Sequence, residues 1–318
     1  MRLMYSILKK FSNKDLLYIR ELITGILAKK LSYHGQSKLF WDINGYSRNL
    51  HVTVANPSKN DLEIYKNHLV DDRKDKKVLL LGSTPLLRNL LNEIGFRDYV
   101  IADFSFSTIE SSLHALDKLG LNIDIENEIW LKSNWLDMPL EPNSFDYIVG
   151  DMIFTQIEPS KQSFFITKIS SLLKQDGNFI ARMQICNTNF DSKNPQSIIE
   201  EVLSSNDFEN TTRQKFILLF RLKDRLRDKQ TQTTSPHLIT NELLRFHTSD
   251  EKRKDMLRSV IKMISGRIDV GLPFITQTRE ELEQIISQEF SIKTRLNARD
   301  YLSEDFPIYV LQKNINKS

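Results

Sequence analysis

Apolar and polar residues follow two patterns along the middle of the chain: short continuous apolar runs, and apolar residues at helical spacing. Short apolar runs that end at turn residues predict strands buried on both faces, near residues 78–81, 99–103, 128–132, 146–150 and 178–183. Segments with apolar residues at helical spacing lie between them, near residues 85–94, 106–118 and 160–174. Strands that alternate with helices in this way predict a parallel, doubly wound sheet.

The segment before this alternation has a helical pattern followed by an irregular one. Residues 1–35 carry apolar residues at helical spacing, with Lys and Arg between them, and predict helix. Residues 36–58 show no regular period, and residues 59–70 predict a short helix that leads into the first strand. We therefore interpret residues 1–56 as an N-terminal helical or lid segment, and the strand–helix core as starting at residue 57.

The pattern changes after the fifth strand. Residues 187–275 contain no clear strand–helix unit, and amphipathic stretches near residues 216–227 and 255–264 predict a mainly helical insertion. Between residues 211 and 268, basic residues outnumber acidic ones about two to one. We interpret the insertion as an acceptor-binding or lid region, although a solvated helical face would also explain its charge.

Residues 276–318 return to the earlier alternation. The stretch 276–282 has threonine followed by acidic residues, which is typical of a capped helix start. Alternating runs at residues 290–296 and 306–311 predict two closing strands. Together with the five strands above, they predict a mostly parallel, seven-stranded sheet.

The first predicted strand–helix unit has the features of a ligand-binding turn. Its apolar run stops at Gly82, and Pro85 occupies the first helical position, where the amide that proline lacks would be unpaired anyway. Ser83 or Thr84 can cap this helix, whose free N–H groups and positive dipole end favour an anionic group. Asp103 ends the next apolar run about 20 residues after the glycine, the spacing that places a carboxylate on a nucleotide ribose.

The glycine pattern of this turn excludes the usual dinucleotide site. The G-x-G-x-x-G pattern lets the backbone approach a pyrophosphate, but Thr84 and Leu87 stand where its second and third glycines would be. No P-loop pattern occurs either. A ribose acid without a phosphate-binding turn favours a nucleoside cofactor that has no phosphates, such as S-adenosylmethionine. A plain buried strand followed by a capped helix is the alternative for this segment.

Composition narrows the class of protein. The chain has 318 residues, is 40% hydrophobic and carries a formal net charge of +3, which fits one large domain or two smaller ones. With Cys186 as the single cysteine, an intramolecular disulfide and a cysteine-based zinc site are both excluded, and we expect no metal site. No apolar stretch reaches the roughly 18 residues of a membrane span, and no signal-peptide pattern is present, so we expect a cytoplasmic protein without membrane contact.

Several stretches, taken in order, resemble the motifs of class I S-adenosylmethionine-dependent methyltransferases. Residues 78–85 are similar to a variant first motif in which Gly-x-Thr-Pro replaces the glycine-rich loop, and Asp103 stands where the family's ribose-binding acid stands. Residues 134–140 resemble the stretch whose aspartate meets the adenine amino group. Residues 145–151 resemble the fourth strand, which ends near the reactive methyl. The last two predicted strands resemble the antiparallel pair that ends this fold.

The resemblance implies a Rossmann-like core over residues 57–186, completed by residues 276–318, and an S-adenosylmethionine site at its strand ends. The implied cofactor-binding residues are Gly82, Ser83, Thr84, Pro85, Asp103, Phe104, Ser105, Trp135, Leu136, Asp137, Asp151 and Met152. In this interpretation Asp103 accepts from the ribose hydroxyls and Asp137 from the adenine amino group. Other roles stay open, because Asp103 could cap a helix, Asp137 could serve a turn, and Asp151 could cap a strand end.

The catalytic group is not defined by these motifs. Residues 151–154 lack both prolines of the Asp/Asn-Pro-Pro-Tyr/Phe tetrapeptide found in enzymes that methylate nucleobase amines. Cys186 does not follow a proline, as the nucleophile for C5-pyrimidine methylation normally does. The weak candidates that remain are Tyr46, Arg48 and Asp151, the first two from the aromatic segment that in this fold commonly folds over the cofactor.

The resulting hypothesis is a methyltransferase that acts on an oxygen or nitrogen atom of a small-molecule or peptide acceptor. One alternative is an RNA methyltransferase that uses the basic insertion for phosphate contacts. The others are a methyltransferase-like module that binds without catalysis and an NAD-dependent enzyme. The helical first 35 residues could also serve a homodimer.

Overall fold

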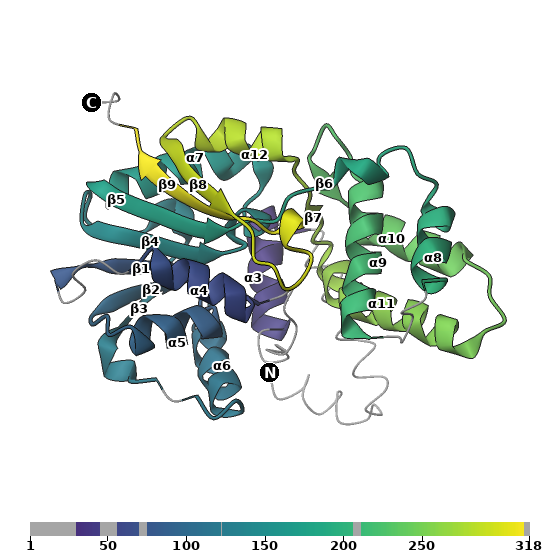
Figure 1. Cartoon of the computed structure of the whole chain (residues 1–318), viewed down its shortest axis with the longest axis horizontal. Helices are drawn as coiled ribbons and strands as arrows, with labels where there is room; N and C mark the ends of the chain where they lie inside the picture. Colours follow the sequence, from purple (N-terminus) through teal and green to yellow (C-terminus); the bar gives the residue numbers. More distant parts are fainter. Residues whose placement is uncertain (1–29, 45–55, 70–74, 122, 206–210, 315–318) are drawn as a thin grey trace, which may run out of the picture.

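The computed structural model describes residues 30–44, 56–69, 75–121, 123–205 and 211–314. An α/β core holds the sheet and its flanking helices, and a group of helices stands beside it (Figure 1). The helical segment predicted for residues 1–35 falls largely outside the described residues. Tyr46 and Arg48 also lie outside them.

The main sheet has seven strands in the order β3-β2-β1-β4-β5-β9-β8. The strands are β1 (Val78–Leu81), β2 (Tyr99–Asp103), β3 (Glu128–Lys132), β4 (Phe145–Asp151), β5 (Leu173–Arg182), β8 (Phe290–Leu296) and β9 (Ile308–Lys313). All pairs from β3 to β5 are parallel, while β9 is antiparallel to both β5 and β8. The predicted mostly parallel, seven-stranded, doubly wound sheet is therefore confirmed.

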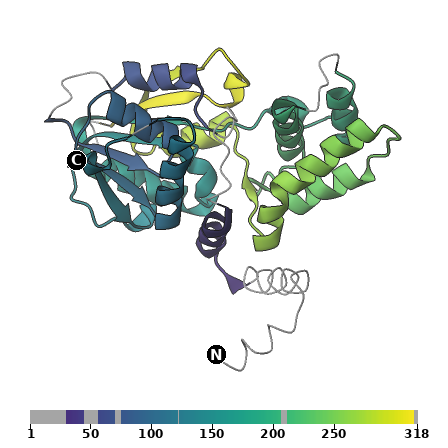
Figure 2. The ribbon, with the colours of Figure 1, turned by 90° about the horizontal axis from the view of Figure 1, so that it is seen from below.

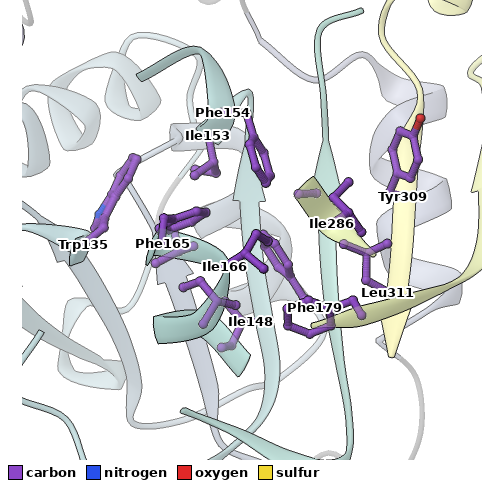
Figure 3. Packing of buried hydrophobic residues seen from close by; sticks show 14 of the residues in the cluster. Trp135, Ile148, Ile153, Phe154, Phe165, Ile166, Phe179, Ile286, Tyr309 and Leu311 are labelled. Atoms are coloured by element: carbon purple, nitrogen blue, oxygen red, sulfur yellow. The ribbon is translucent and has the colours of Figure 1, made fainter. Parts of the chain in front are cut away.

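Helices cover both faces of this sheet (Figure 1). They are α4 (Lys59–Asn67), α5 (Pro85–Glu93) and α6 (Phe106–Asp117) on one face, and α7 (Pro159–Leu172) and α12 (Arg279–Ile286) on the other. Alternate strand residues supply the two cores, since Leu79 packs with the α7 side and Leu80 with the α4 and α5 side. Figure 3 shows how Phe165 and Ile166 of α7 and Ile286 of α12 pack against Ile148, Phe179 and Leu311 of the strands.

The insertion forms a helical body with its own apolar core (Figure 1). It contains α8 (Pro195–Leu203), α9 (Thr212–Arg225), α10 (Pro236–Arg245), α11 (Glu251–Val270) and the short strand pair β6 (Thr233–Thr234) and β7 (Phe274–Ile275). The chain crosses from the core into this body and back at adjacent points. Cys186 N–H donates to the Gln277 carbonyl at 2.7 Å, so the two crossings are held together.

Helix α3 (Tyr33–Asn44) lies at the junction of the core and the helical body (Figures 1 and 2). The prediction that residues 36–58 are irregular is therefore wrong for residues 36–44. The helix contacts both α11 and α6. Its Leu39 and Phe40 pack against Val270 and Leu272. These contacts with residues far along the chain stabilise a helix that the local pattern does not show.

Other boundaries differ slightly from the predictions. Strand β5 begins at Leu173, five residues before the predicted start. Short 3-10 helices are η3 (Ile125–Asn127), η4 (Trp135–Asp137), η5 (Ile153–Gln156), η6 (Thr188–Phe190) and η7 (Ser303–Asp305). Among the described residues, no helix combines the length and the apolar character needed to cross a membrane.

Candidate functional site

A cavity of about 370 Å³ opens where the parallel strands end. The residues at or just after the carboxyl ends of four strands contribute to its lining: Gly82 after β1, Asp103 of β2, Asp151 of β4 and Gln184 after β5. The strand order reverses between β1 and β4. Ligands of doubly wound sheets bind at such a reversal, outside the carboxyl ends of the strands. The cavity therefore has the position expected of a binding site.

The turn after β1 depends on its glycine. Gly82 has a φ of +77°, which side-chain-bearing residues rarely adopt, and a Cβ there would lie 3.3 Å from the indole of Trp135. The Trp135 ring is held in place because its Nε1–H donates to the Ala102 carbonyl at 2.7 Å. The indole therefore forms a fixed wall beside the turn, and the missing side chain at Gly82 keeps the backbone accessible.

Asp103 is 5% exposed and lines the cavity at the end of β2. Its Oδ2 accepts from the Ser83 hydroxyl at 3.2 Å, and its Oδ1 accepts from the Ser105 N–H at 3.0 Å. Ser105, not Asp103, is the N-cap residue of α6. These contacts orient the Asp103 carboxylate at the cavity, and its oxygens are acceptors of the kind that a ligand hydroxyl requires.

The start of α5 also faces this cavity. Pro85 is the first residue of the helix, and Thr84 occupies the N-cap position without a side-chain hydrogen bond to the helix. Since Ser83 donates to Asp103, neither of the predicted side-chain caps is formed. Among the described residues, then, no side chain caps the N-terminal amides and the positive end of this helix dipole.

Asp151 is held in a buried ion pair at the end of β4. Arg182 donates to it twice, from Nε to Oδ1 at 2.7 Å and from Nη2 to Oδ2 at 3.1 Å. The same guanidinium donates to the Tyr301 hydroxyl at 2.8 Å and lies 3.3 Å from Asp61. Burial is the largest single effect on Arg182 and lowers its pKa, but Asp151, Tyr301 and Asp61 together outweigh burial and raise that pKa. The ion pair fixes Asp151 and opposes a role for it as a free base.

Met152 follows directly and has a φ of 53°, in the left-handed region. Its N–H donates to the Arg182 carbonyl at 2.8 Å, which fixes this uncommon conformation. Such a backbone costs on the order of 1–3 kcal/mol and persists only where the surroundings impose it, often at functional sites. Because Met152 lines the cavity, its strained backbone supports the assignment of the site.

The opposite wall comes from α3 and the helical body. Its lining side chains are Phe40, Trp41, Phe216, Leu219, Phe220, Met263, Ile264, Arg267, Phe274 and Ile275. Trp41 Nε1–H donates to Gln156 Oε1 at 2.9 Å, so α3 is tied to the segment that follows β4. This wall is apolar and aromatic, with Arg267 as its charged member.

Most of the residues predicted for the cofactor line the cavity. These are Gly82, Ser83, Thr84, Asp103, Phe104, Trp135, Asp151 and Met152. The remaining four do not. Pro85 is buried at the start of α5, and the Ser105 hydroxyl donates to Asp42. Leu136 packs against the core on the α7 side, and Asp137 is exposed in η4.

The apolar wall contains functional candidates that the sequence did not indicate. Phe40 and Arg267 of this wall were not singled out, and neither was Gln184 at the end of β5. The described residues provide no hydrogen bond to the Gln184 side chain. An amphipathic pattern marked parts of the insertion, but nothing in it showed which face would meet the strand ends.

The side chains of the cavity restrict its chemistry. Among the described residues that line it there is no histidine, lysine or cysteine. Cys186 lies outside the cavity, and burial followed by the nearby Asp224 carboxylate raises its pKa to about 12, so it is no thiolate nucleophile at neutral pH. Nowhere in the described part of the chain do three or more His, Cys, Asp or Glu side chains gather as a metal site.

Comparison with known proteins gives matches in structure alone. No family model and no curated protein matches the sequence. The PH0226 protein from Pyrococcus horikoshii OT3 is 15% identical, with a TM-score of 0.47, over 80% of this chain and 88% of that chain. A protein provisionally named as a Zn-dependent alcohol dehydrogenase from Rhodobacter sphaeroides is 13% identical, with a TM-score of 0.56, over 88% of this chain and 99% of that one.

A methyltransferase named as S-adenosylmethionine-dependent, from Aquifex aeolicus, is 13% identical, with a TM-score of 0.42, over 79% of this chain and 89% of that chain. Other matched structures also carry the name S-adenosylmethionine-dependent methyltransferase. At these identities the likeness concerns the fold and does not define an activity.

Proposed function

We propose that the protein is an S-adenosylmethionine-dependent methyltransferase that acts on an oxygen or nitrogen atom of a small-molecule or peptide acceptor. The observation that carries this proposal is the pairing of Gly82 and Asp103 in one cavity at the strand reversal, without the glycines of a pyrophosphate turn. S-adenosylmethionine supplies a methyl group on a sulfonium, ready for displacement by a nucleophile.

The residues of the strand-end wall match the parts of this cofactor. Asp103, oriented by Ser83 and Ser105, would accept from the ribose hydroxyls. The uncapped start of α5, with Thr84, would face the carboxylate of the methionine part. Trp135 and Phe104 line the cavity with aromatic rings suited to packing on adenine.

Besides binding the cofactor, the protein would position the acceptor and exclude water from the cavity. An acceptor must hold its nucleophile in line with the methyl group, and a closed apolar cavity favours that arrangement. The aromatic side chains of α3 and the helical body supply an apolar wall of this kind. We therefore assign the helical body and α3 to acceptor binding. A cytoplasmic location and a homodimer stay predictions from the sequence.

The surface of the helical body gives less support to an RNA substrate. Many of its basic side chains have acidic partners, including Lys193 and Arg221 with Glu201, and Arg253 with Glu200. Because these cations are paired with carboxylates, they attract a phosphate backbone less strongly. The volume of the cavity, about 370 Å³, also favours a compact acceptor.

Calorimetry with S-adenosylhomocysteine tests the proposal. The wild-type protein should bind it, and Asp103→Ala should weaken binding by about 1–3 kcal/mol, the cost of leaving polar ligand groups unpaired. Asp137→Ala is the matched control, because this aspartate is exposed outside the cavity, and its affinity should equal that of the wild type. Circular dichroism would establish that both variants are folded.

Two results would overturn the proposal. One is a folded wild-type protein that binds neither S-adenosylmethionine nor S-adenosylhomocysteine. The other is preferential binding of NAD in the same titrations. If the cofactor binds but no methyl transfer to any offered acceptor is seen, the non-catalytic binding module becomes the better description.

A further inference from the structure

Arg267 places a cation in the apolar wall of the cavity. It lies in the last turn of α11, on the side of the cavity opposite the strand ends. Its guanidinium carbon lies 4.5 Å from the ring centre of Phe274 and 5.1 Å from that of Phe40. Two aromatic rings thus hold the guanidinium within the wall.

Within the part of the chain that the structure describes, this guanidinium makes one side-chain hydrogen bond. Nη1 donates to the Pro273 carbonyl at 3.0 Å, whereas a guanidinium has five N–H donors. Within the described ranges, no carboxylate forms an ion pair with Arg267, although many other cations of the helical body have such partners. The negative end of the α11 dipole offsets part of the charge.

Among the described residues, Tyr33 is the ionisable neighbour that affects Arg267, and it does not neutralise the guanidinium. Tyr33 of α3 lies close enough for its phenol to feel the guanidinium charge. Burial is the largest effect on Tyr33 and raises its pKa to about 12, so the phenol is neutral at pH 7. The surrounding lining side chains Phe216, Phe220, Met263 and Ile264 carry no charge.

The charges of the cavity are therefore separated between its two walls. The carboxylates of Asp103 and Asp151 belong to the strand-end wall, and the Arg267 guanidinium belongs to the opposite one. A cation in apolar surroundings is costly unless an anion pairs with it, and a guanidinium matches the two oxygens of a carboxylate. The wall thus provides aromatic surfaces beside one anion-binding group.

From this arrangement we infer that the acceptor is an organic acid with an apolar, preferably aromatic, body, and that Arg267 binds its carboxylate. The inference rests on the proposed function for the identity of the other ligand, and it specifies the substrate class of the same cavity. Arg267 acts as a specificity residue, because an acceptor of the same shape without the acid group leaves its donors unpaired.

The experiment compares two probes that differ only in charge. 6-Hydroxy-2-naphthoate and 6-hydroxy-2-naphthamide are titrated separately into the protein saturated with S-adenosylhomocysteine, and their dissociation constants are measured by calorimetry. We expect the acid to bind at least about tenfold more tightly than the amide to the wild-type protein, as a charge-assisted pair provides.

Three variants locate the source of that preference. Arg267→Gln should remove it, and Arg267→Lys should keep part of it, since lysine retains the charge without the two-pronged geometry. Arg258→Gln is the control from the same helix, where the side chain is 67% exposed, and it should retain the full preference. An unchanged affinity for S-adenosylhomocysteine and an unchanged melting temperature would show that each variant is folded.

Equal affinities for the two probes, no binding of either probe, or a preference that survives Arg267→Gln would each overturn the inference while S-adenosylhomocysteine still binds. If S-adenosylhomocysteine does not bind, the same titrations are run on the protein alone. A preference for the acid that depends on Arg267 would then support the anion site and leave the cofactor proposal refuted.

Discussion

The two walls of the cavity are built by different physical means. The strand-end wall is held by hydrogen bonds and buried charges, with Asp103 oriented by two serines and Asp151 bound by Arg182. The wall from the helical body is held by apolar packing, with Arg267 as an isolated charge among aromatic rings. The first arrangement fixes a few atoms closely, and the second shapes a surface. The hydrogen-bonded strand-end wall therefore suits a cofactor that is shared by many reactions, and the apolar wall suits a particular acceptor.

The largest effect is expected from breaking the buried charge network of the strand-end wall. Arg182→Met leaves the carboxylates of Asp151 and Asp61 buried without their cation. Removing one partner of a buried ion pair costs about 3–5 kcal/mol of unfolding free energy, which urea denaturation would measure. Arg258→Met, on the exposed face of α11, should change stability by no more than about 0.5 kcal/mol. A loss below about 1 kcal/mol in Arg182→Met would contradict the importance of buried charge here.

The next largest effect concerns packing in the helical body. Leu218 of α9 is fully buried in its core, so Leu218→Ala should cost about 2–5 kcal/mol through lost contacts and a cavity. Leu244→Ala, at a position that is 65% exposed on α10, is the matched control and should be nearly neutral.

Hydrogen exchange sharpens this second comparison. Amides of α9 should exchange faster in Leu218→Ala, while those of β4 keep the protection seen in the wild type. Equal loss of protection in both elements would show that the core and the helical body unfold as one unit, and would remove the distinction between the two walls.

A smaller, pH-dependent effect is expected where the two parts join. Burial, followed by the nearby Asp224 carboxylate, raises the pKa of Asp305 from 3.8 to about 6. A raised carboxyl pKa contributes stability that is complete below about pH 4 and is lost as the pH rises through about 6. Compared with Asp305→Asn, the wild type should therefore lose about 1–2 kcal/mol between pH 5 and pH 7.5 in urea denaturation. A difference between the two proteins that does not change with pH would contradict this.

The smallest effect is expected at the helix that bridges the walls. Trp41→Phe keeps an aromatic ring but removes the hydrogen bond to Gln156, and should lower stability by about 0.5–1.5 kcal/mol. Trp130→Phe is the control, because it removes a similar bond to Glu128 outside the cavity. Both should lower the melting temperature, but only Trp41→Phe should weaken binding of the naphthoate probe. Equal probe affinities would show that Trp41 has no role in the cavity.

The strand-end wall could be predicted because its residues follow from local patterns. An apolar run that stops at Gly82 identifies a strand end, and the next run identifies Asp103 in the same way. Since parallel strands present their carboxyl ends at one edge, the sequence also indicates that these residues meet. Asp137 shows the limit of this reasoning, because the short η4 helix leaves its side chain exposed, away from the cavity.

The wall from the helical body could not be predicted, because its residues do not follow from local patterns in the sequence. Helix α3 has a weak local pattern and is stabilised by Phe40 and Trp41, which contact residues more than a hundred positions away along the chain. Arg267 is one basic residue among many in the insertion, and nothing in its neighbourhood along the sequence marks it as facing the cavity. Its surroundings arise only when α3 and α11 pack together.

The paired crossings between the core and the helical body limit how the cavity can change shape. The hydrogen bond from Cys186 to Gln277 joins the two crossing segments, and the Arg227–Glu281 ion pair and the Phe220–Phe306 ring contact add further links between the helical body and the core. Helix α3 contacts both α11 and α6, so it adds a third connection that holds the two walls of the cavity at a fixed separation.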